Sequence, residues 1–93
     1  MDREILHFVI SNCIYDVLQK NGVGYEDEIP SLEDDIDTVV NAFLPMPRQQ
    51  SFLDQALGSV YRAPKSKAIV ALRKPAIGME VRECIKVKLK IDK

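Results

Sequence analysis

Apolar residues recur at helical spacing through the first segment of the chain, residues 2–21. With a period of about 3.6 residues, they define one face of a helix: Leu6, Val9, Ile10, Cys13, Ile14 and Val17. Asp2 lies near the expected N-terminus, where the helix dipole favours negative charge, and Gly22 follows the expected C-terminus as a cap. The pattern therefore predicts a helix of about five turns.

Two more helices are predicted between residues 31 and 61, after a connector over residues 23–30. Ser31 is the candidate N-cap of the second helix, whose apolar face is formed by Leu32, Ile36, Val39, Val40, Phe43 and Leu44. Pro45 and Pro47 end it because proline cannot donate into a continuing ladder. The third helix is predicted over about residues 48–61, where apolar residues again recur at helical spacing.

The pattern changes in the last third of the chain. From Ile85 to Ile91 apolar residues alternate strictly with lysines, which predicts a strand within residues 79–91. The short run at residues 68–73 is rich in Ile, Val and Ala and is predicted as its partner strand, with residues 74–78 as the hairpin loop. The predicted fold class is α+β: three helices followed by a C-terminal antiparallel β-hairpin packed on the helices, in the order ααα-ββ. Residues 1–93 form one small domain, since a chain of this length has room for one core.

Acidic and basic residues are segregated along the chain. Residues 1–40 carry ten carboxylates and two cations, a formal charge of −8, whereas residues 41–93 carry eleven cations and four carboxylates, a formal charge of +7. The net charge of −1 hides this separation. Such a field governs association and choice of partner rather than fold, so the basic half is expected to meet a nucleic acid, an acidic partner or the acidic half of another copy.

The first helix carries apolar residues on more than one face. Phe8, Tyr15 and Leu18 lie away from Val9 and Cys13, and Phe8 and Tyr15 fall within about 20° of each other around the helix. One interpretation is a partner-binding stripe formed by Phe8, Tyr15 and Leu18. The alternative is a central helix buried on both sides, with the stripe packed under the hairpin or the connector at residues 23–25.

Nucleic-acid binding is the alternative function. Three helices and a hairpin follow the element order of a winged helix, in which the third helix enters the major groove and the wing contacts the backbone. The candidate contacts are Arg48, Gln49, Gln50, Arg62, Lys65, Lys67, Arg73, Lys74, Lys86, Lys88 and Lys90. The alternating lysines are also typical of a solvated strand that resists edge-to-edge aggregation.

Catalytic and metal-binding patterns have little support in the sequence. His7 is the single histidine, its polar neighbours at i±3 and i±4 spacing are Arg3, Glu4 and Ser11, and a nucleophile–His–acid set could be assembled only with distant residues. Asp34, Asp35 and Asp37 lack the spacing of a calcium loop and suit the N-terminus of a helix instead. We therefore expect no enzyme activity, no catalytic residue, no metal, no cofactor and no small-molecule substrate.

The expected compartment is the cytoplasm, including a host cytoplasm for a viral chain. There is no run of about 18 apolar residues that predicts a membrane span, and the acidic start Met-Asp-Arg-Glu is unlike a signal peptide. Cys13 and Cys84 are too few for a disulfide framework, so reduced thiols are expected, with a single Cys13–Cys84 bridge as the alternative. Together the sequence favours a small, non-enzymatic protein-interaction or regulatory protein of bacterial or viral type. It is expected to self-associate or bind a partner protein and to have no membrane partner.

Overall fold

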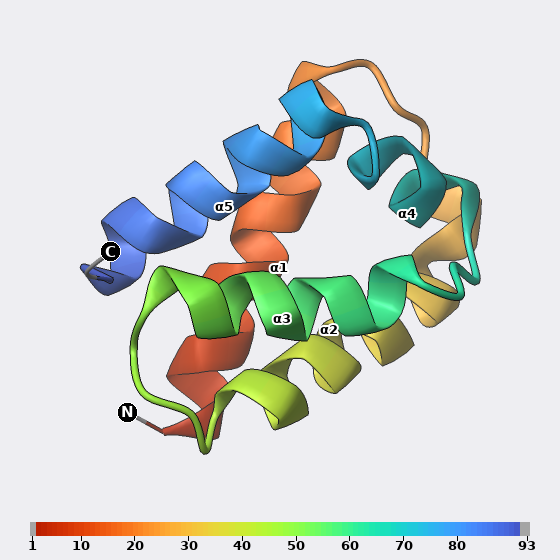
Figure 1. Cartoon of the computed structure of the whole chain (residues 1–93). Helices are drawn as coiled ribbons and strands as arrows, with labels where there is room; N and C mark the ends of the chain where they lie inside the picture. Colours follow the sequence, from red (N-terminus) through yellow and green to blue (C-terminus); the bar gives the residue numbers. More distant parts are fainter. Residues whose placement is uncertain (1, 92–93) are drawn as a thin grey trace.

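The computed structural model describes residues 2–91, and this part of the chain is built from helices without a β-hairpin (Figure 1). The elements in order are α1 (Arg3–Lys20), the short 3-10 helix η1 (Glu26–Glu28), α2 (Ile29–Phe43), α3 (Gln50–Tyr61), α4 (Lys67–Leu72) and α5 (Pro75–Leu89). The predicted α+β class is therefore wrong, because both predicted strands are helices.

Helix α1 begins and ends where the sequence predicts. The Asp2 Oδ1 atom accepts a hydrogen bond from the Ile5 backbone N–H at 2.9 Å. Gly22 adopts a φ of +71°, and the Val23 N–H donates to the Leu18 carbonyl at 2.9 Å. This arrangement satisfies carbonyls of the last turn, and glycine accommodates the left-handed conformation without strain.

The second and third helices confirm their predicted apolar faces but correct one boundary. Helix α2 begins at Ile29, with Pro30 in its first turn, so Ser31 is not its N-cap. Proline is well suited to the first turn because its φ is already helical and its missing N–H has no helical partner there. The buried residues of α2 include Leu32, Ile36 and Phe43, as the helical spacing predicted.

Helix α5 replaces the predicted second strand and its loop. Pro75 occupies its first turn, and burial follows helical spacing through Gly78, Val81 and Ile85. In a strand Ile85 and Val87 would share a face, but here Ile85 is buried and Val87 is 72% exposed. Successive alternate residues in a helix turn by about 200°. Lys86, Lys88 and Lys90 therefore form no row, and the predicted strand face of lysines is wrong.

Helix α4 replaces the predicted first strand and depends on two side-chain caps. Ser66 Oγ accepts a hydrogen bond from the Ile69 N–H at 3.1 Å. Glu28 Oε2 accepts from the Lys67 N–H at 2.7 Å, and Glu28 Oε1 accepts from the Ala68 N–H at 3.3 Å. Such short helices have little stability of their own, so these caps and the burial of Ala68, Ile69 and Leu72 hold α4 in place.

Helix α1 packs on α2 along one side and on α5 along another, and α3 packs on α2 (Figure 1). Side chains from all five α-helices meet in one apolar cluster. Of the alternatives open from the sequence, the structure has α1 buried on two sides, which accounts for apolar residues on more than one of its faces.

The junction between α4 and α5 predicts opposite effects for two glycine substitutions. A Cβ atom added at Gly78 would lie 2.8 Å from the Leu72 backbone oxygen, whereas one added at Gly58 in α3 has no neighbouring atom within 4 Å. Gly78→Ala should lower the free energy of unfolding by about 1–3 kcal/mol because backbone must move. Gly58→Ala should raise it by about 0.5–1 kcal/mol because alanine favours a helix. Urea denaturation of both variants measures the contrast, and equal effects would contradict the close α4–α5 approach.

The C-terminus of α5 predicts a stabilising substitution. Lys90 adopts a left-handed φ of +54°, while the Ile91 N–H donates to the Lys86 carbonyl at 3.0 Å. Lys90→Gly should raise the free energy of unfolding by about 0.5–1 kcal/mol, since glycine relieves the left-handed strain. Lys90→Ala loses the same charge but keeps the strain, so it should not stabilise. Thermal denaturation of the two variants separates these effects, and equal melting temperatures would exclude strain as the cause.

Candidate interaction surface between α1 and α5

A groove runs between α1 and α5, which lie side by side in opposite directions. The C-terminal end of α1 meets the N-terminal part of α5, where Lys20 Nζ lies 3.0 Å from Glu80 Oε2. The groove has a volume of about 490 Å³. Its lining residues are Asp16, Val17 and Lys20 from α1 and Glu80, Glu83, Cys84, Val87 and Lys88 from α5. Apolar side chains and charges of both signs thus border one surface.

Lys20 and Glu80 form an ion pair in this groove, and Asn21 also donates a hydrogen bond to Glu80. Hydrogen bonds from Lys20 and Asn21 hold the pKa of the Glu80 carboxyl below its ordinary value. Because Lys20 and Glu80 neutralise each other, the charges of Asp16, Glu83 and Lys88 dominate the rest of the groove.

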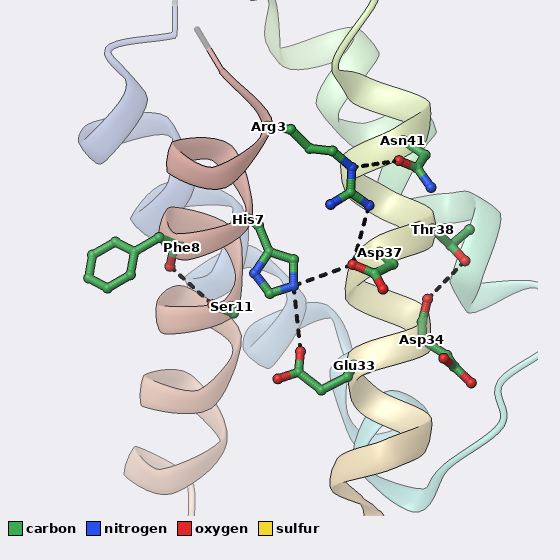
Figure 2. Close-up of polar contacts among 9 residues, drawn as sticks. All are labelled: Arg3, His7, Phe8, Ser11, Glu33, Asp34, Asp37, Thr38 and Asn41. Atoms are coloured by element: carbon green, nitrogen blue, oxygen red, sulfur yellow. Dashed lines mark hydrogen bonds and ion pairs between the residues drawn. The ribbon is translucent and has the colours of Figure 1, made fainter.

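Three exposed apolar side chains lie on the two helices that form the groove. Ile5 is 52% exposed, Phe8 65% and Val87 72%. Ile5 and Asp16 are eleven residues apart and therefore project within about 20° of each other from α1, and Val87 itself lines the groove. Figure 2 shows Phe8 on the side of α1 that faces away from α2. We call Ile5, Val87 and the groove-lining residues the α1–α5 face, together with Phe8 at its margin, which projects about 80° from Asp16 around α1.

The predicted stripe of Phe8, Tyr15 and Leu18 is divided by the fold. Phe8 is exposed, but Leu18 is fully buried in the core. Tyr15 is half-buried and stacks on Tyr25 of the connector, with ring centroids 5.1 Å apart and planes tilted by 34°. The connector therefore packs on Tyr15, as the alternative interpretation had it, and Phe8 two turns away is exposed.

The residues proposed for nucleic-acid contact fall into three separate regions. Arg48, Gln49 and Gln50 lie at the start of α3, where the Arg48 guanidinium is held over the Phe43 ring at 4.9 Å. Around α4 lie the exposed cations Arg62, Lys65, Lys67, Arg73 and Lys74. Lys86, Lys88 and Lys90 lie around the end of α5. Since the described residues contain no hairpin, the wing of the winged-helix interpretation is missing.

A polar cluster between α1 and α2 was not foreseen from the sequence (Figure 2). Arg3 donates to Asn41 Oδ1 at 3.2 Å and to Asp37 Oδ1 at 3.4 Å. His7 Nε2 lies 3.4 Å from Asp37 Oδ1 and 3.6 Å from Glu33 Oε2. The signal was present as two pairs with i, i+4 spacing, Arg3 with His7 and Glu33 with Asp37, because such pairs share a helix face.

This cluster joins two helices and holds no nucleophile for His7 to activate. The nearby Ser11 hydroxyl donates to the Phe8 carbonyl at 3.1 Å. Within residues 2–91, no three His, Cys, Asp or Glu side chains are grouped in a way that could hold a metal ion. Asp34, Asp35 and Asp37 point in different directions around α2, since Asp35 is buried while Asp34 is exposed.

The opposed charges of the two halves are not neutralised by ion pairs within the described chain. The Arg3–Asp37 pair lies inside the acidic half, and the Arg82–Asp54 pair inside the basic half. Lys20–Glu80 joins the halves but uses a cation of the acidic half and a carboxylate of the basic half. The excess charge of each half therefore stays available to an outside partner.

Comparison of the chain with models of protein families, with curated proteins and with solved structures gives no match. Over residues 2–91, the helices lack the combination of length and apolar character that a bilayer crossing requires.

The buried carboxyl of Asp35 predicts a pH-dependent stability. Asp35 is only 4% exposed, its Oδ2 atom has no hydrogen-bond partner, and burial raises its pKa, with Lys65 opposing and Asp34 reinforcing the shift. A carboxyl whose pKa is higher in the folded state destabilises that state above this pKa, and the cost fades as pH falls toward the unfolded value.

Asp35→Asn should therefore raise the free energy of unfolding by about 0.5–1 kcal/mol at neutral pH, and the gain should shrink on acidification to about pH 4. Urea titrations across this pH range check it. The exposed Asp27 provides the control, since Asp27→Asn removes the same charge without relieving burial. A gain that is constant with pH would show that ionisation of Asp35 is not its cause.

Proposed function

We propose that this chain is a small helical protein-interaction or regulatory protein that self-associates through the α1–α5 face. The observation that carries the proposal is the exposure of Ile5, Phe8 and Val87 on the two helices that border the groove. Contiguous exposed apolar surface rimmed by polar residues is typical of an interaction site. The occupant we propose is a second copy of the chain.

Charges of both signs on the α1–α5 face suit a second copy as the occupant. Helix α1 carries two cations and two carboxylates, and α5 carries three cations and two carboxylates. A twofold axis through the α1–α5 boundary places α1 of each copy on α5 of the other, because an isologous interface uses the same surface twice. Asp16 of each copy then lies opposite Lys88 of the other.

The dimensions of the face are adequate for such a pairing. Helices α1 and α5 contain 18 and 15 residues, which corresponds to lengths of about 27 and 22 Å. A stable interface buries about 800 Å² on each partner, and the described surface measures 5376 Å². Two neighbouring helices of these lengths present an area of this order.

Light scattering coupled to size-exclusion chromatography, over a range of protein concentrations, tests self-association. Val87→Glu places a charge on the wall of the groove and Phe8→Glu places one on the exposed side of α1, so each should weaken the dimer roughly tenfold or more. Val70→Glu is the matched control, because Val70 is 50% exposed on α4, away from the face. A monomer at every concentration, or equal weakening by all three variants, would contradict the proposal.

A charge exchange makes the test specific for two identical copies. Asp16→Lys and Lys88→Asp should each weaken association, whereas the double variant should recover it, because every Asp16–Lys88 contact is re-formed with reversed sign. Circular dichroism of each variant confirms that the helices are intact. Failure of the double variant to recover association would exclude the proposed twofold arrangement.

Nucleic-acid binding is the alternative function, and a separate experiment tests it. The exposed cations around α4 are the surface on which it would depend. A mobility-shift titration with duplex DNA and single-stranded RNA at low salt measures it, and phosphate contacts would give an affinity that falls steeply with added salt. Salt-sensitive binding that is lost in Arg73→Glu and unaffected by Phe8→Glu would favour this alternative over the proposed interaction through the α1–α5 face.

A further inference from the structure

Cys13 and Cys84 are brought together by the packing of α1 on α5. Cys13 lies on α1 and is fully buried, whereas Cys84 lies on α5, is half-buried and lines the groove. Both thiols are free, and Cys84 packs against the apolar cluster that contains Cys13. The fold thus places one accessible thiol over one protected thiol, at positions 71 residues apart in the chain.

We propose that the Cys13–Cys84 pair is a dithiol modification site that reacts with a low-molecular-weight disulfide, such as oxidised glutathione, to form an intramolecular disulfide. In the first step the Cys84 thiolate attacks one sulfur of the glutathione disulfide, so that a mixed disulfide forms and one glutathione leaves as its thiolate. In the second step the Cys13 thiolate attacks the Cys84 sulfur and releases the second glutathione. The protein loses two electrons and two protons, and the glutathione disulfide gains them as two thiols.

Access decides which cysteine reacts first. Attack on a glutathione disulfide requires the attacking sulfur to reach a bulky reagent in solution, and only Cys84 opens into the groove. Burial raises the pKa of the Cys13 thiol, and the neighbouring Cys84 raises it further. The buried thiol is therefore a poor first nucleophile.

The first step also prepares the second. Burial, the main cause of the raised pKa of Cys13, persists in the mixed disulfide, but the part that comes from the Cys84 thiol is removed and the Lys88 ammonium still acts to lower the pKa. The Cys84 sulfur is then the electrophile that Cys13 attacks.

This inference does not depend on self-association, because both thiols belong to one chain and the groove of the single chain is open to glutathione disulfide. The consequence for the molecule is a covalent link between α1 and α5 that encloses most of the chain. Cross-links that close long loops restrict the unfolded state, so the oxidised form should resist urea to a higher concentration than the reduced form.

The test uses the full reduced chain, incubated without oxygen in excess oxidised glutathione, quenched with N-ethylmaleimide under denaturing conditions and measured by intact-mass spectrometry. The wild-type chain should accumulate a species lighter by two hydrogens that takes up no maleimide, with little glutathione adduct. Cys13→Ala should stop at a stable glutathione adduct on Cys84. Cys84→Ser should react roughly tenfold more slowly or not at all, because its remaining thiol is buried.

Three outcomes would overturn the inference: a persistent glutathione adduct on the wild-type chain, a Cys84–Cys84 link between two chains, or equal reactivity of the two single variants. Circular dichroism shows whether Cys13→Ala keeps its helices. Should that variant fail to fold, the wild-type product and the Cys84→Ser rate still decide the matter. A wild-type chain that cross-links internally but stays monomeric would support the dithiol site and contradict the proposed self-association, so the two failures are distinguishable.

Discussion

The burial of α1 on two sides is the constraint on which the rest of the structure depends. Leu6, Ile10 and Ile14 are enclosed in the core, and α2 and α5 each pack along this helix. A chain of this length has material for one core only, so the central helix must be apolar on more than one face. Its exposed apolar residues are Ile5, which projects close to Asp16 of the groove, and Phe8, on the side away from α2 (Figure 2).

Regular amphipathic helices were predictable, and the C-terminal third was not. Leu32, Ile36 and Phe43 of α2 mark a single face whose helical period has no competing interpretation. Between Ile85 and Ile91 a strict alternation matched the strand period, while the helical positions Gly78, Val81 and Ile85 were obscured because glycine does not register as apolar. Tertiary packing against Leu72 and the first-turn proline at position 75 favour the helix, and neither effect is visible in a local pattern.

The candidate site, like the fold, was only partly predictable from the sequence. Phe8 was predicted as an interface residue and is exposed, because the helix that carries it was predicted correctly. Leu18 is in the core and Tyr15 lies under Tyr25, since the path of the connector depends on Gly22 and the turn that follows. Val87 and Cys84 could not be placed beside α1 until α5 was known to be a helix. The opposed charges of the two halves were readable directly from the sequence.

The capping of α4 by Glu28 affects the order in which backbone amides become protected from hydrogen exchange during folding. Its acceptor oxygens bind two amides that lie 39 and 40 residues further along the chain. Helix α4 is thus fully capped only when η1 docks, because Ser66 within the C-terminal segment caps the Ile69 amide alone. Slow hydrogen exchange at the Lys67 and Ala68 amides would therefore report a long-range docking event, and a chain divided after α2 would separate a cap from the helix that it serves.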